Sequence, residues 1–166
     1  MFRCIEYTAF LWKAKGRHGT HSPFAYWLVD VVGRLNPQKE VPFAHQIKSK
    51  KTRQFAAKLS AALPDHLLCD LVSFDQNSSK PCICIISYKQ TAYFEQMLEH
   101  DYIHPESIFI VTTPKNKINH EFWKKVCNKA EFHFSADCYF FGLLSPRPGQ
   151  AKEHFYLKLS WTTNIL

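Results

Sequence analysis

Apolar residues recur at helical spacing over the first fifteen residues of the chain. Intervals of three, four and three residues separate the apolar positions, which predicts an amphipathic helix over residues 2–15. Gly16 follows in the position where a C-terminal cap ends a helix. The residues expected on the buried side of this helix are Phe2, Ile5, Ala9 and Trp12.

Two further helices are predicted before residue 64. Ser22 suits an N-terminal cap and Pro23 suits the first helical position, so a helix begins there and stops at Asn36 and Pro37. Its expected buried stripe consists of Phe24, Trp27 or Leu28, Val31 and Leu35. Residues 37–48 look irregular, and a third helix is predicted over residues 52–63. Its expected apolar face consists of Phe55, Leu59, Ala62 and Leu63.

The hydrophobic pattern changes to short continuous runs after residue 66. Residues 67–74 and 82–88 have the length and composition of buried strands. A loop of about seven residues between them is too short for a parallel crossover. The two runs are therefore expected to be antiparallel neighbours, unless one of them is not a strand.

The order strand, helix, strand, helix, strand, strand is predicted from residue 82 onward. Residues 93–99 read as a helix, residues 107–112 read as a buried strand, and Asn119 is expected to cap the next helix. The apolar side of that helix would hold Phe122, Trp123, Val126 and Cys127. Residues 131–144 and 154–160 then form two strands, and Pro146, Pro148 and Gly149 mark the turn between them.

Two separated motifs resemble a bacterial family of class I S-adenosylmethionine (SAM)-dependent methyltransferase-like proteins. The first is Arg17-His18-Gly19-Thr20-His21-Ser22-Pro23-Phe24, which matches a His-Gly-x-His-Ser-Pro-Phe signature. The second combines Asp137, Gly142 and the run Gln150-Ala151-Lys152-Glu153-His154-Phe155. Together the matches cover roughly the first 35 and the last 60 residues. The family-signature positions are His18, His21, Ser22, Pro23, Phe24, Asp137, Gly142, Lys152 and His154.

The pattern and the resemblance together predict an α/β fold. We expect a partial Rossmann-like, methyltransferase-type three-layer sheet of about four to six strands with an antiparallel C-terminal strand pair, preceded by N-terminal helices. One domain spans residues 1–166, with a helical extension at 1–36, a basic linker and helix at 37–66, and a half-sheet at 67–166. Residues 67–74 either replace a lost first strand or pair at the sheet edge. An uncovered edge would permit a homodimer, whereas residues 37–48 could cover it.

The cofactor loop of such a fold is missing from the sequence. A SAM-type site lies at the carboxyl ends of the first strands, where glycines let the backbone approach the ligand. The chain has five glycines, and none stands between residues 34 and 141. In one register of the resemblance Asp75 is the family's acidic residue after the fourth strand. In the other register residues 82–86 are that strand, and Ser87 replaces the acid.

We therefore expect no cofactor and no metal, although SAM stays open as a ligand. His18 and His21 form an H-x-x-H pair, but no further metal ligand accompanies them. Asp75 is the single candidate for cofactor binding. No nucleophile–base pair and no phosphate-binding loop is recognisable, so no catalytic residue is assigned.

Positive charge is concentrated in the first 60 residues. That part holds 11 Lys and Arg against 3 Asp and Glu, whereas the remainder holds 10 against 11. Such an imbalance favours contact with nucleic acid, an anionic membrane surface or an acidic protein; the alternative is a solvated helix face. The predicted basic surface consists of Arg17, Lys48, Lys50, Lys51 and Arg53.

No apolar run approaches ~20 residues, and no secretory signal is recognisable. The six cysteines are scattered and form no C-x-x-C pair, which favours reduced thiols and a cytoplasmic location. Three functional hypotheses follow. The first is a non-catalytic binding protein on a methyltransferase-like scaffold. The second is an active SAM-dependent methyltransferase with a rebuilt pocket. The third is a half-protein that completes its sheet with another subunit.

Overall fold

The computed structural model describes residues 2–14, 21–36, 41–42, 47–74, 78–100, 103–112 and 117–159. The α-helices in these residues are α1 (Phe2–Lys13), α2 (Pro23–Trp27), α3 (Lys50–Ala62), α4 (Thr91–His100) and α5 (Lys117–Asn128). The strands are β1 (Leu67–Asp70), β2 (Cys82–Ile86), β3 (Ile108–Thr112), β4 (Phe134–Asp137), β5 (Phe141–Ser145) and β6 (Glu153–Tyr156). A π-helical segment (Leu28–Val32) continues α2, and a 3-10 turn (Tyr88–Gln90) precedes α4.

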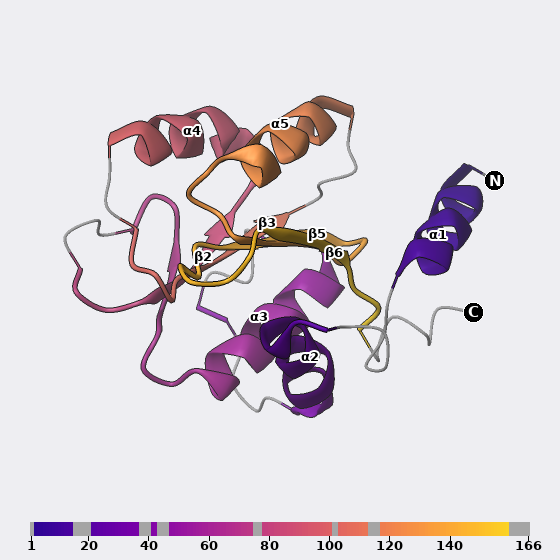
Figure 1. Ribbon diagram of the computed structural model, residues 1–166, viewed down its shortest axis with the longest axis horizontal. Helices are drawn as coiled ribbons and strands as arrows, with labels where there is room; N and C mark the ends of the chain where they lie inside the picture. Colours follow the sequence, from indigo (N-terminus) through magenta and orange to yellow (C-terminus); the bar gives the residue numbers. More distant parts are fainter. Residues whose placement is uncertain are drawn as a thin grey trace.

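The six strands form one mixed sheet in the order β1-β2-β3-β5-β4-β6. All neighbouring strands are parallel except where β5 pairs with β3 and with β4. Helices α4 and α5 cover one face of this sheet, and α2 and α3 cover the other (Figure 1). The expected mixed α/β architecture with up to six strands is thus confirmed. The predicted order strand, helix, strand, helix, strand from residue 82 to β4 is also found.

The antiparallel pairing predicted for the first two strands is wrong. β1 and β2 are parallel, with Leu67 opposite Cys82 and Asp70 opposite Ile85. β1 ends at Asp70 rather than Phe74, because Oδ1 of Asp70 accepts a hydrogen bond from the Ser73 amide and turns the chain. The connection is therefore residues 71–81, just long enough for a crossover of ~10–12 residues. As predicted for one alternative, β1 lies at the sheet edge.

The prediction for the C-terminal strands is also wrong. The hairpin bends at residues 138–140 and joins β4 to β5, so the predicted strand over 131–144 is two strands. Tyr139 adopts a φ of 66°, and its amide donates to Oδ1 of Asp137 at 2.7 Å. Strand β6 follows the Pro146–Gly149 connection and pairs parallel to β4. An aspartate thus turns the chain at a point where a continuous strand was predicted, and the predicted turn at Pro146, Pro148 and Gly149 connects β5 to β6 instead.

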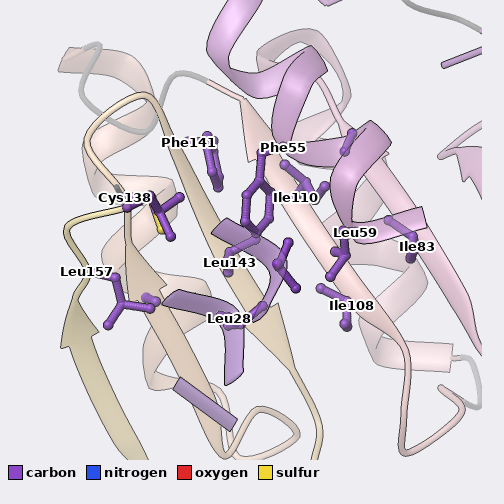
Figure 2. Packing of buried hydrophobic residues seen from close by; sticks show 14 of the residues in the cluster. Leu28, Phe55, Leu59, Ile83, Ile108, Ile110, Cys138, Phe141, Leu143 and Leu157 are labelled. Atoms are coloured by element: carbon purple, nitrogen blue, oxygen red, sulfur yellow. The ribbon is translucent and has the colours of Figure 1, made fainter. Parts of the chain in front are cut away.

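Two apolar cores lie on the two faces of the sheet. The first joins the sheet to α2 and α3 (Figure 2), and the second joins it to α4 and α5. All residues of β2, β3 and β5 are buried. In Figure 2 Leu59 of α3 lies beside Ile108 and Ile83, near the amino ends of β3 and β2. The Phe55 ring lies 4.7 Å from the ring of Phe141, which pairs with Thr112 at the carboxyl end of β3.

Helix α3 therefore runs antiparallel to β2 and β3, and its first turn lies toward the carboxyl edge of the parallel strands. Its predicted apolar face is confirmed for Phe55 and Leu59, which are fully buried, whereas Ala62 and Leu63 are half-buried. Ser49 caps the helix by accepting from the Thr52 amide at 3.2 Å. The helix thus begins two residues earlier than predicted.

The predicted cap of α2 is confirmed. Ser22 is the N-cap and its hydroxyl accepts from the Ala25 amide, with Pro23 in the first turn. The predicted stripe holds for Phe24 and Leu28 but not for Val31, which is 42% exposed. The π-helical turn from Leu28 to Val32 rotates the following residues, so Val29 and Val32 are buried instead.

Two other helix predictions need correction. Trp12 is 94% exposed and Ala9 is also exposed, whereas Phe10 is buried. Phe10 packs on Tyr139 and Tyr156 at ring distances of 5.4 and 6.4 Å, so contact with the sheet edge decides which face of α1 is covered. α5 begins at Lys117, so Asn119 is inside this helix and not its cap. Phe122, Trp123 and Val126 are buried as predicted.

Gly142 has a packing role in β5. A Cβ atom at this position would lie 2.3 Å from the nearest ring atom of Trp123, and the three closest atoms all belong to the six-membered part of the indole. The absence of a side chain therefore lets α5 pack its tryptophan directly on the β5 backbone.

We predict that Gly142→Ala lowers the free energy of unfolding by about 1–3 kcal/mol through this overlap. Urea denaturation followed by tryptophan fluorescence and circular dichroism would measure the loss. The control is Trp123→Phe, which removes the overlapping ring. In that background Gly142→Ala should cost clearly less, and equal costs in both backgrounds would contradict the packing explanation.

Candidate functional site

α/β sheets bind ligands at the carboxyl ends of their parallel strands, which here include the ends of β1 and β2. The Asp70 carboxylate is engaged with the Ser73 amide. Ser87 is the N-cap of the 3-10 turn, and its amide donates to Oε1 of Gln90 at 2.9 Å. Both groups thus have local capping roles. Asp75, the candidate acidic residue, lies outside the described residues.

The C-terminal signature residues also make structural contacts. Asp137 is buried and turns the β4–β5 hairpin, and Gly142 accommodates Trp123. The Lys152 ammonium donates to the carbonyl of Lys129, just beyond α5, at 2.5 Å. A cation is favourable at this end of a helix. These contacts need no ligand.

His154 belongs to the same group. Its Nδ1 lies 2.8 Å from the Ser135 hydroxyl, and its ring meets Trp123 edge-on at 6.3 Å. Desolvation lowers the pKa of His154, which Asp137 partly offsets. His154 thus joins β6 to Ser135 of β4 and contacts Trp123 of α5.

The two separated sequence motifs meet in space. Nε2 of Gln150 donates to the Ser22 hydroxyl at 3.2 Å, although 128 positions separate them. The Arg147 guanidinium stacks on the Phe24 ring at 3.6 Å from its centroid. His21 immediately precedes Ser22 in the sequence and is exposed, whereas His18 lies outside the described residues. The motifs are therefore two sides of one contact.

A hollow of about 410 Å³ lies next to this junction. It is lined by Pro105, Glu106, Arg147, Pro148, Gly149 and Gln150. The hollow lies at the amino edge of β3, opposite the edge where a Rossmann-type cofactor binds. The amide of Arg147 donates to the carbonyl of Pro105 at 3.1 Å, which joins the two turns that form the hollow.

Two polar atoms at this edge are buried without a hydrogen-bond partner. They are Nε of Arg147 and Nδ1 of His66; Thr52 Oγ1 is the third such atom in the described part of the chain. An unpaired buried polar atom costs about 1–3 kcal/mol. Arg147 also adopts a left-handed φ of 43°, which is unfavourable for a residue with a side chain. Backbone strain and unpaired buried polar atoms of this kind are concentrated at functional sites.

His66 reaches the same edge from the residue before β1. Its Nε2 donates to the carbonyl of Glu106 at 3.1 Å, because a carbonyl can only accept. Burial lowers the pKa of His66, with smaller opposing contributions from Glu106. Sequence reasoning missed Arg147, His66 and Glu106. The one available signal was Arg147 itself, a cation held between two prolines in a turn.

The predicted basic surface lies at the start of α3. Lys48 and Lys50 are exposed, and Lys51 and Arg53 are half-buried; Arg17 lies outside the described residues. Nη1 of Arg53 donates to the carbonyl of Ile47 at 2.6 Å and ties the preceding chain to the helix. No acidic residue stands in the first turn. Four cations thus gather at the positive end of the helix dipole.

The cysteines and histidines of the described residues form no recognisable metal site. No group of three potential ligands within metal-binding reach exists among the described residues. Cys69, Cys82, Cys84, Cys127 and Cys138 are free thiols. Burial raises the pKa of Cys138 and of Cys84, so these thiols stay protonated.

Among the described helices, none combines the length and apolar character needed to cross a bilayer.

Comparison with known protein families, curated proteins and solved structures finds no match to this chain.

The lowered pKa of His66 predicts a pH-dependent stability. The unfolded chain binds a proton near pH 6.5, whereas the folded chain binds it only at lower pH. This contribution is therefore complete above pH 6.5 and is lost as the pH falls below it. His66→Gln should flatten the loss between pH 7 and 5, as measured by urea denaturation in phosphate-free buffer. His120→Gln, at an exposed position on α5, is the control. Equal slopes in wild type and His66→Gln would refute the assignment.

Proposed function

We propose that this chain is a binding protein on a methyltransferase-like scaffold, without SAM binding or catalysis, and that it contacts a polyanionic partner through the start of α3. Nucleic acid is the partner that this chemistry fits best. The observation that carries the proposal is the charge of α3: the segment from Ile47 to Ala62 holds five Lys or Arg residues and no carboxylate.

The charge arrangement opposes folding of the isolated helix. Cations at a helix N-terminus are unfavourable because the dipole is positive there, and these cations also repel one another. The pKa of Lys58 is lowered first by burial and then by the nearby charge of Lys51. The Lys58 ammonium donates to the carbonyl of Gly33 at 2.6 Å. A partner with closely spaced negative charges would relieve this repulsion, as phosphates of a nucleic acid do.

The methyltransferase-like scaffold is supported by the order of elements and by the antiparallel β5. Catalysis receives less support, because the residues that the resemblance supplies are engaged elsewhere. Asp137, Gly142, Lys152 and His154 hold turns, α5 and Ser135 in place. A binding role requires none of them to be free, which is why we favour it over methyl transfer.

We predict binding to a fluorescein-labelled 20-base-pair DNA duplex that weakens steeply with salt. The double variant Lys50→Glu/Lys51→Glu should bind at least about tenfold more weakly. The slope of log affinity against log salt should fall by about 1.8, at about 0.9 per phosphate contact. Fluorescence anisotropy at several salt concentrations would measure both quantities.

The matched control is Lys89→Glu/Lys124→Glu, which changes net charge equally at two exposed positions beside α4 and on α5. This variant should retain most of the affinity. An equal loss in both double variants would mean that only net charge matters. No measurable duplex binding by the wild type at low salt would exclude nucleic acid as the partner.

We predict that calorimetric titration with SAM and S-adenosylhomocysteine yields no saturable heat at millimolar ligand. The reason is the lack of glycines after β1 and β2, where a backbone must approach the cofactor closely. Saturable micromolar binding would instead support the alternative, an active methyltransferase with a rebuilt pocket. This measurement is independent of the salt series, so the two parts of the proposal can fail separately.

A further inference from the structure

The hollow at the amino edge of β3 has the properties of a small binding site that is separate from α3. Its walls are the turn before β3 and the connection between β5 and β6, which contribute Pro105, Glu106 and residues 147–150. We propose that this hollow binds an oxyanionic group, a phosphate or a carboxylate, through the guanidinium of Arg147.

The walls of the hollow are held firmly in place. Oγ of Ser145 donates to the carbonyl of Ser107 at 2.8 Å, and Oγ of Ser107 accepts from the Cys82 amide at 3.1 Å. The carbonyl of Pro146 accepts from the amide of His133 at 3.1 Å. Arg147 itself is tied by its amide to Pro105 and by its carbonyl to the Gln150 amide. The backbone is thus preorganised, which lowers the entropic cost of binding a ligand.

The guanidinium of Arg147 is positioned to bind a negatively charged group. One face of its guanidinium lies on the Phe24 ring, which fixes its plane while leaving the edge donors unused. Nε has no hydrogen-bond partner, and no ion pair joins this guanidinium to a carboxylate in the described part of the chain. Desolvation lowers the pKa of Arg147, and Glu106 raises it. A guanidinium with free edge donors binds phosphate or carboxylate in two-pronged fashion.

The neighbouring titratable groups set the sign of the pH dependence. His66 donates to the Glu106 carbonyl, and Nδ1 of His104 accepts from the Glu106 amide at 3.2 Å. Protonation of His66 adds positive charge beside Arg147 and strengthens anion binding. The Glu106 carboxylate is exposed and opposes an anion. Affinity should therefore rise as the pH falls, and it should rise when Glu106 is neutralised.

The test is a titration of the full chain with inorganic phosphate, sulfate and acetate at constant ionic strength, followed by the amide NMR shifts of Arg147, Gly149 and Gln150. We expect saturable shifts below about 10 mM for at least one anion. Preference for phosphate over acetate identifies a phosphate group, and the reverse identifies a carboxylate. No saturable shift with any of the three overturns the proposal.

Two variants, each with a control, test the roles of Arg147 and Glu106. Arg147→Gln should weaken binding about tenfold or more, with Arg34→Gln, at an exposed position on another face, as its control. Glu106→Gln should strengthen binding several-fold, with the exposed Glu131→Gln unchanged. Glu106→Gln does not touch the Phe24 stacking, so it stays informative if Arg147→Gln unfolds. Weaker anion binding by Glu106→Gln would mean that the Glu106 carboxylate does not oppose the bound anion, and the proposal would be wrong.

Sulfate keeps its charge between pH 5 and 8 and is therefore the probe for pH dependence. The affinity of the wild type should rise as the pH falls, and His66→Gln should abolish most of the rise. A pH profile that His66→Gln leaves unchanged would remove His66 from the site.

Discussion

Burial of the central strands on both faces is the constraint on which the other features depend. The residues of β2, β3 and β5 are all buried, and these strands consist almost wholly of apolar residues. Every polar group that serves a purpose other than packing must then stand at the edges of the sheet. The Ser107 and Ser145 hydroxyls show this rule, because both are buried at strand ends and both are hydrogen-bonded.

The residues that resemble the methyltransferase-like family are explained by the same constraint. Helices that cover both faces of the sheet must pack closely on it, and Gly142 of β5 permits such a close contact with Trp123 of α5. It also needs α2 to be attached to the opposite end of the chain, which the Ser22–Gln150 and Phe24–Arg147 contacts achieve. Residues with these roles are required for folding whether or not a cofactor binds. Their presence therefore supports a scaffold and carries no information about methyl transfer.

The sequence was most informative where a local rule determines the structure. Ser22 and Pro23 define a helix start by their own chemistry, and the apolar run of β3 has no alternative inside a folded domain. Wrong predictions arose where a single side chain redirects the backbone or where a distant contact decides. The left-handed Tyr139 is stabilised by Asp137, and the covered face of α1 depends on packing against Tyr139 and Tyr156. Neither effect leaves a periodic signal.

The same difference between local and long-range effects decides which candidate site could be predicted from the sequence. The basic start of α3 is visible in the sequence because its four cations, Lys48, Lys50, Lys51 and Arg53, lie within six consecutive residues. The hollow is not visible, because Phe24, His66, Glu106 and Arg147 come from four separate segments. Their separation also bears on function, since the two sites lie at opposite ends of the parallel strands. A polyanion on α3 and a small oxyanion beside Arg147 therefore need not compete.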